Sequence, residues 1–208
     1  LAIGRFLVEH GCTHLVVACN TATAAAANAL RASLPHIPVI GIEPGVKPAA
    51  QLTKSGVVGV LATTRTLHSD RFQRLVGNHA NHVRVLAQAC PGLADTIEHE
   101  GADSPAVGKL LDAYIAPLAA AGADVVVLGC THYPWVAEAI ARRMPAGTVL
   151  LDTGEAVARQ TERLLSAAGL LGGGHGQLTL ATSGAPQQVK ATVDRLFAQS
   201  MHVEHWEP

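Results

Sequence analysis

The chain has 208 residues and a formal net charge of -1; 49% of its residues are hydrophobic, 15% charged and 3% aromatic. This length and apolar content permit one large or two small globular domains with a sizeable core. Lys and Arg are scattered along the chain, so no basic stripe is available to neutralise a phosphate backbone, and aromatic platforms for base stacking are scarce. We therefore expect a small polar ligand and no nucleic-acid partner.

The cysteine pattern and the absence of targeting signals bear on the cellular compartment in which the protein is expected. Cys12, Cys19, Cys90 and Cys130 are not spaced as C-x-x-C pairs, and the sequence shows neither a signal peptide nor an apolar run of membrane-spanning length. A reduced cytoplasm with no membrane partner is therefore expected. The chain begins on Leu1, within an amphipathic helical pattern, and we expect it to be a fragment whose beginning is missing.

In chain order, short apolar runs alternate with amphipathic segments. Such alternation predicts an α/β fold with parallel sheets that helices cover on both faces. The expected strands cover residues 15–18, 39–42, 57–61, 83–87, 125–128, 148–151 and 178–181, and the expected helices cover residues 1–10, 23–34, 46–52, 68–75, 104–121, 134–144 and 155–168. A turn is expected at 63–66, and the glycine-rich residues 172–176 are expected to form a flexible linker, because they precede a strand instead of following one.

Two turns divide this pattern into two expected domains. Glu43-Pro44-Gly45 and Asp152-Thr153-Gly154 are predicted to be crossings between them. The first α/β domain would comprise residues 1–43 plus 152–208, and the second would comprise residues 44–151. We expect the two parallel sheets to face each other, with an active site in the cleft between them.

One phrase occurs twice. The first copy is His14-Leu-Val-Val-Ala-Cys19-Asn-Thr21, and the second, similar copy is Asp124-Val-Val-Val-Leu-Gly-Cys130-Thr-His132. Each apolar run predicts a buried parallel strand that ends in a cysteine beside a helix start. Ligands bind at that edge of α/β sheets, and helix amides there favour a thiolate. Two matched thiols therefore predict one two-sided active site.

Paired thiols suit stereochemical inversion, in which one thiolate removes a proton and the other thiol delivers one to the opposite face. For Cys12 and Cys90, burial as small hydrophobic residues is the simpler interpretation. The neighbours Asn20, Thr21, Thr131 and His132 offer donors and acceptors for a carboxylate and an ammonium group, although Asn and Thr also cap helices. His132 would either assist Cys130 electrostatically or orient the motif.

No metal site is expected. His202 and His205 lie on a short polar tail with no third ligand at a suitable spacing. That tail is predicted to be a solvated terminus.

Five segments resemble the aspartate/glutamate racemase superfamily, and within it the glutamate racemases. They are Val-Ala-Cys-Asn-Thr-Ala-Thr-Ala at 17–24, Val-Ile-Gly-Ile-Glu-Pro-Gly at 39–45, Val-Gly-Val-Leu-Ala-Thr at 58–63, Leu-Gly-Cys-Thr-His-Tyr-Pro at 128–134 and Ala-Thr-Ser-Gly-Ala-Pro at 181–186. The resemblance spans nearly the whole chain. It implies interconversion of L- and D-glutamate without pyridoxal phosphate, another cofactor or a metal, to supply D-glutamate for peptidoglycan.

The same resemblance assigns roles to residues. It implies that Cys19 acts on the α proton of D-glutamate and Cys130 on that of L-glutamate, and that Asn20, Thr21, Thr131 and His132 contact the substrate. Glu98 matches an acidic residue near the second thiol, with a solvated helix charge as the alternative, and Thr63 and Thr66 match a turn near the substrate carboxylate. By analogy with the family, a homodimer is expected.

One departure from the family and three rival interpretations remain. The family's Asp-Ser-Gly and Pro-Tyr-Gly segments are absent from this sequence, so we expect these 208 residues to be weakly active or inactive alone. The rivals are a racemase acting on aspartate or hydantoins, a hydrolase that uses Cys130 and His132, and a non-catalytic ligand-binding or regulatory remnant.

Overall fold

The computed structural model describes residues 1–174, 176–198 and 200–208, and a four-stranded parallel sheet lies at the centre of its larger lobe. The strand order is β4-β3-β5-β6. The strands are β3 (Val57–Ala62), β4 (Arg84–Ala89), β5 (Val125–Gly129) and β6 (Val149–Leu151). In the strand register Ala62 pairs with Gly129, so the carboxyl ends of β3 and β5 lie side by side. Ligands bind at this edge in open α/β sheets.

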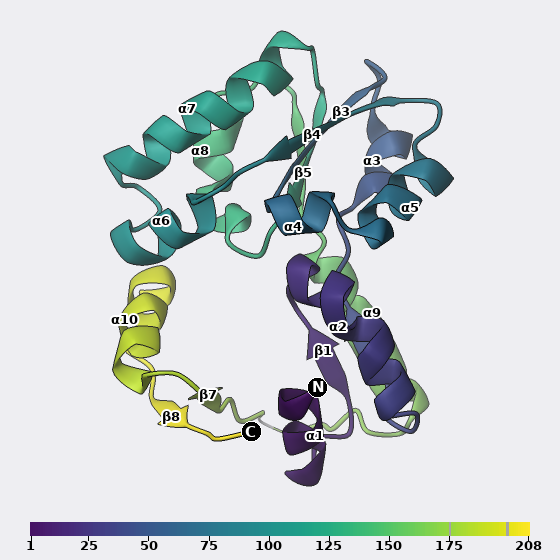
Figure 1. Cartoon of the computed structure of the whole chain (residues 1–208), viewed down its shortest axis with the longest axis vertical. Helices are drawn as coiled ribbons and strands as arrows, with labels where there is room; N and C mark the ends of the chain where they lie inside the picture. The colour runs from purple at the N-terminus through teal and green to yellow at the C-terminus, as the bar shows by residue number, and fades with distance from the viewer. Residues whose placement is uncertain (175, 199) are drawn as a thin grey trace.

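Helices cover both faces of this sheet (Figure 1). On one face lie α6 (Leu93–Glu100), α7 (Pro105–Ala120), the 3-10 helix η1 (Tyr133–Val136) and α8 (Ala137–Ala141); on the other lie α3 (Val46–Leu52), α4 (Thr64–Leu67) and α5 (Asp70–His79). Alternate side chains of β5 enter opposite cores: Val126 and Leu128 join the first, whereas Val125 and Val127 join the second. Burial on both faces explains the continuous apolar sequence of this strand.

The smaller part of the molecule carries the first cysteine motif. Here β1 (Leu15–Val17) and β2 (Val39–Gly41) pair in parallel, and a small core forms around Leu15, Leu30 and Val39. The accompanying helices are α1 (Ala2–Glu9), α2 (Asn20–Ser33) and α9 (Gly154–Ala167). A third sheet pairs β7 (Leu180–Thr182) with β8 (Val203–His205), and α10 (Pro186–Phe197) connects them.

The chain passes from the smaller part to the larger lobe before α3 and returns after β6 (Figure 1). The two connections touch, because a side chain at Gly45 would overlap Leu151. The far end of the chain, α10, reaches α6 of the larger lobe.

The predicted alternation of parallel strands and helices is confirmed, but several elements differ. The terminus predicted to be solvated instead forms β8, in which Val203 is buried and pairs with β7. The single helix expected over 134–144 is divided into η1 and α8, and the turn expected at 63–66 leads into the short helix α4. The helices α6 and α10 were not predicted. His175, within the expected linker, lies outside the described residues.

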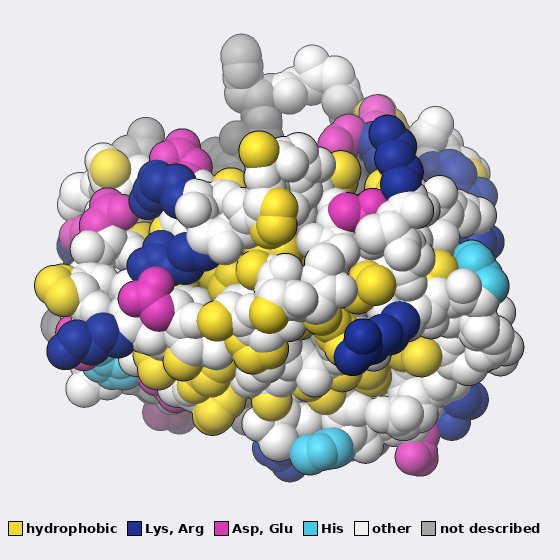
Figure 2. All heavy atoms as spheres, turned by 90° about the horizontal axis from the view of Figure 1, so that it is seen from above, with side chains coloured by type: hydrophobic (Ala, Val, Ile, Leu, Met, Phe, Trp, Pro, Cys, Tyr) yellow, Lys and Arg dark blue, Asp and Glu magenta, His cyan; other side chains and the backbone are white. Residues whose placement is uncertain are grey.

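The surface shows charges of both signs. On the face of the molecule in Figure 2, Lys and Arg side chains are interspersed with Asp and Glu, and hydrophobic side chains lie between them. None of the described helices combines the length and apolarity needed to span a bilayer.

Candidate active site

Cys19 lies where β1 gives way to α2. Its backbone is extended, with φ -133° and ψ 124°, and it occupies the N-cap position of α2. The alanine-rich sequence that follows favours a helix, and its first turn closes when the Thr23 amide donates to the Cys19 carbonyl at 2.8 Å. The residue is exposed and lies at the N-terminus of α2.

Asn20, the next residue, is 4% exposed, and neither its amide oxygen nor its amide nitrogen has a partner among the described residues. Burying two unpaired polar atoms is costly. Asn20 does not cap the helix through its side chain, so the capping alternative does not apply to it. Its side chain faces a small cavity whose wall includes Thr66, Arg71 and Glu43.

Three hydroxyl groups connect the two cysteine-bearing parts of the molecule. The Oγ1 atom of Thr21 lies 2.8 Å from that of Thr63 and 3.0 Å from that of Thr66. Thr63 also donates to Thr66 at 3.0 Å and caps α4 by accepting from the Thr66 amide at 3.2 Å. The triangle therefore joins the first turn of α2 to the loop between β3 and α4.

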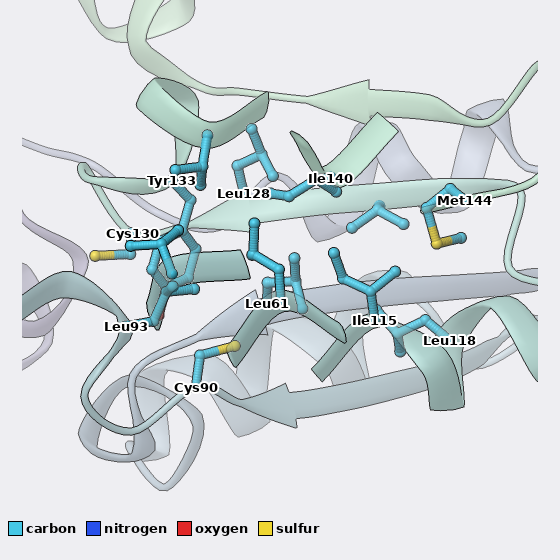
Figure 3. Close-up of a cluster of buried hydrophobic side chains, with 14 of the residues drawn as sticks. Leu61, Cys90, Leu93, Ile115, Leu118, Leu128, Cys130, Tyr133, Ile140 and Met144 are labelled. Carbon is cyan, nitrogen blue, oxygen red and sulfur yellow. The ribbon is translucent and has the colours of Figure 1, made fainter. Parts of the chain in front are cut away.

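Cys130 lies at the carboxyl end of β5, at the edge of the core that Figure 3 shows, and its side chain is 9% exposed. Burial raises the pKa of its thiol, and charge on Cys19 raises it further, while the His132 backbone amide and the Thr131 hydroxyl lower it. The Thr21 hydroxyl contacts Thr63 and Thr66, which follow β3, and the end of β3 pairs with the end of β5, just before Cys130. Tertiary folding therefore brings the two cysteine motifs together, although they are 111 positions apart in sequence.

His132 lies between the Cys130 thiol and a carboxylate. Its Nδ1 is 3.6 Å from Cys130 Sγ, and its Nε2 is 2.5 Å from Glu98 Oε1. Donation from Nε2–H to Glu98 leaves Nδ1 free to accept the thiol proton. The Glu98 carboxylate is thus paired with His132 while its side chain stays 39% exposed, and the helix that carries it, α6, was not predicted.

The arrangement brings the predicted site residues into two groups. Asn20, Thr21, Thr63 and Thr66 surround the start of α2, whereas Glu98, Thr131 and His132 surround Cys130; of these, Thr131 is exposed. Arg195 was missed; it donates to the Glu98 backbone carbonyl from α10. No sequence signal links residues so far apart. The described residues contain no group of three or more His, Cys, Asp and Glu placed to hold a metal ion.

An α/β fold with a cysteine at the end of each of two parallel strands is the arrangement expected of a racemase, a class of isomerase. The family model for Asp/Glu/Hydantoin racemase matches residues 2–161. The chain belongs to this racemase family.

Individual relatives agree. The glutamate racemase of Pseudomonas entomophila is 48% identical over 203 residues, which are 97% of this chain and 77% of that relative. Among solved structures, glutamate racemase isoform RacE1 from Bacillus anthracis aligns with a TM-score of 0.87 at 29% identity, covering 99% of this chain and 77% of that one. The Escherichia coli glutamate racemase, solved with L-glutamate and the activator UDP-MurNAc-ala, aligns with a TM-score of 0.82 at 29% identity, covering 98% and 77%.

Proposed function

We propose that this chain interconverts L- and D-glutamate with two thiols as proton carriers. The observation that carries the proposal is the set of contacts from Thr21 to Thr63 and Thr66, which hold the start of α2 and Cys19 against the sheet edge that carries Cys130, in a chain whose relatives are glutamate racemases. A racemase must reach its substrate's α carbon from both faces, so a base on each side is the simplest arrangement.

The proposed reaction is a proton relay without a covalent intermediate. In one direction the Cys130 thiolate removes the α proton of L-glutamate, and the Cys19 thiol then protonates the opposite face of the carbanion to give D-glutamate. The reverse reaction exchanges these roles. A thiol can serve as acid or base in such a relay, and Nδ1 of His132, 3.6 Å from Cys130 Sγ, would accept the proton of Cys130.

The polar residues around the thiols would orient the substrate. Hydroxyls of Thr21, Thr63 and Thr66 can donate to a carboxylate as readily as to one another. Asn20 has unused donor and acceptor capacity in the same region, and Thr131 and His132 would complete the contacts. No cofactor or metal enters this scheme.

The proposal extends to organisation and role. Residues 1–43 plus 152–208 would form one domain and residues 44–151 the other, with the substrate between them. This division is supported by the contacting connections at Gly45 and Leu151. By analogy with the family, a homodimer in the cytoplasm would supply D-glutamate for peptidoglycan.

The test is to incubate the protein with L-glutamate in deuterated water, following α-proton loss by NMR together with optical rotation. We expect both exchange and loss of rotation. The rate should be slow, because these 208 residues lack the Asp-Ser-Gly and Pro-Tyr-Gly segments that the family resemblance places at the substrate. Cys19→Ala and Cys130→Ala should each lower racemisation at least about a thousandfold, since general acid–base groups contribute on that order.

Cys12→Ala is the matched control, because Cys12 packs against the small core around Leu15, Leu30 and Val39 and has no role in the proposed relay, so its loss should leave the rate unchanged. Full racemisation by either Cys19→Ala or Cys130→Ala would rule out the two-base mechanism. Exchange of aspartate but not of glutamate by the folded protein would transfer the proposal to the sister substrate.

One observation favours a second candidate. The sequence of contacts from Cys130 through His132 to Glu98 has the connectivity of a nucleophile, base and orienting acid in cysteine hydrolases. A hydrolase would show a burst of acyl-enzyme with an activated ester and would tolerate Cys19→Ala, whereas the racemase would show neither property.

A further inference from the structure

The last turn of α10 contacts the backbone that supports the Glu98 and His132 pair. An Arg195 guanidinium N–H donates to the backbone carbonyl of Glu98. That carbonyl belongs to the last turn of α6, where carbonyl groups have no partner within the helix. A cation is also favoured at a helix C-terminus, so Arg195 stabilises the end of the helix that presents the Glu98 carboxylate.

A second contact reaches the other side of the pair. The Phe197 ring packs edge-on against Trp135, with ring centroids 4.9 Å apart and an interplanar angle of 79°. Trp135 is bound to the His132 segment, because its amide donates to the His132 carbonyl at 3.2 Å. Leu196, which lies between Arg195 and Phe197 in the sequence, packs against the core that contains Cys130.

We propose that Arg195 is a positioning residue for the Cys130 side of the active site. By holding the end of α6, it keeps the Glu98 carboxylate on Nε2 of His132, which in turn keeps Nδ1 directed at the Cys130 thiol. Phe197 supports the same geometry from the η1 side. The catalytic consequence rests on the proposed function, whereas the geometric claim does not.

The effect is specific to one thiol. The ionisable groups that face Cys130 are Cys19, Cys90, Tyr133, Glu98 and His132, and none of them belongs to α10. Arg195 therefore acts on Cys130 through Glu98 and His132. It also lines a neighbouring recess of about 650 Å³, whose other charged walls are Glu100 and Asp103. Cys19 lies on α2, outside this chain of contacts.

The experiment measures thiol reactivity instead of turnover. Protein is alkylated with iodoacetamide from about pH 6 to pH 10, a range that brackets the titration of ordinary thiols. Mass spectrometry then gives a separate pH midpoint for Cys130 and for Cys19. The variants are Arg195→Gln, Arg195→Lys and Phe197→Ala, with Arg163→Gln as control, since Arg163 is an exposed arginine of α9 that contacts Gln160.

We expect Arg195→Gln to raise the Cys130 midpoint by about half a pH unit or more, which corresponds to roughly a threefold loss of thiolate near neutrality. Arg195→Lys retains a cationic donor and should restore most of the shift. Phe197→Ala should shift the midpoint in the same direction. The Cys19 midpoint should not rise in any variant, and Arg163→Gln should leave both midpoints unchanged.

An unchanged Cys130 midpoint in both Arg195→Gln and Phe197→Ala would overturn the proposal. Equal shifts for Cys19 and Cys130 would overturn it too, because they would indicate general loosening. If Arg195→Gln does not fold, Phe197→Ala alone decides. A selective Cys130 shift in a protein that never racemises glutamate would refute the proposed function and leave the positioning role standing.

Discussion

At the scale of single residues, identical side chains have different chemical environments. Cys19 is exposed at a helix start, whereas Cys130 is mostly buried beside His132. Cys90 is buried deeper still, and this burial raises the pKa of its thiol to about 12, so it should stay unmodified at neutral pH. Burial and neighbouring charges, not residue type, therefore distinguish the proposed proton carriers from a structural cysteine.

Asp124 shows how one carboxylate organises a loop. It precedes β5, and its oxygens accept from the amides of Lys54 and Ser55 at 2.7 and 2.8 Å and from the Thr53 hydroxyl at 2.5 Å. Although desolvation opposes ionisation, these hydrogen bonds together hold the pKa of Asp124 below its ordinary value of 3.8. The folded state therefore prefers the ionised form.

We predict that Asp124→Asn lowers the free energy of unfolding by about 1 to 2 kcal/mol at neutral pH, as expected for partly exposed hydrogen bonds to a charged group. Because the folded pKa is depressed, the contribution is present above the ordinary pKa of 3.8 and is lost as pH falls toward the lower folded pKa. Urea unfolding at a series of pH values should show parent and variant converging in acid. Glu162→Gln, on an exposed part of α9, should have no such effect, and a pH-independent gap would contradict the assignment.

At the scale of elements, the position of Cys130 depends on how closely β5 approaches β3. Gly129 permits this approach, because a β carbon there would lie 2.8 Å from the Leu61 carbonyl oxygen and 3.0 Å from the Ala62 β carbon. The glycine is needed for close packing between neighbouring strands. The apolar runs predicted β3 and β5 well, but nothing in the runs themselves indicated this close contact.

We predict that Gly129→Ala lowers the free energy of unfolding by about 1 to 3 kcal/mol, the usual cost of overpacking. It should also lower racemisation by at least about tenfold, since displacing Cys130 by a fraction of an ångström disturbs proton transfer. Denaturant unfolding and the exchange assay measure the two effects.

Gly77→Ala is the control for this substitution. Apart from its chain neighbours and the backbone of its own helix, α5, no heavy atom of the described residues lies within 4 Å of a β carbon at Gly77. Alanine there should raise stability by about 0.5 to 1 kcal/mol and leave the rate unchanged. Equal stabilities for Gly129→Ala and the parent would show that the strands can separate without cost.

At the scale of the whole molecule, the two parts meet at their connections. Gly45 is buried, and a side chain there would overlap Leu151 and come within 3.0 Å of Thr153 Cγ2. The outgoing and returning segments are therefore in direct contact. Such a junction would set the relative position of the thiol-bearing parts.

We predict that Gly45→Ala lowers both the free energy of unfolding, by about 1 to 2 kcal/mol, and the racemisation rate, because it forces the connections apart. Leu151→Val should relieve part of this cost in the double variant. A double-mutant cycle by urea unfolding would reveal the coupling. Strictly additive effects would mean that the two residues do not constrain each other.

The sequence by itself determined the parallel α/β class, the two strand ends that carry thiols and the polar neighbours of each thiol. The spacing of apolar residues and the residue types that follow each strand are local properties of the chain. It did not predict α6, which follows Pro91-Gly92 and is short and polar, nor α10 or β8, whose stability comes from docking. Only the tertiary structure decided that Glu98 binds His132, that Thr21 meets Thr63 and Thr66, and that Arg195 reaches α6. These contacts join residues far apart in the chain, and they exist only once the sheets, helices and connections have packed together.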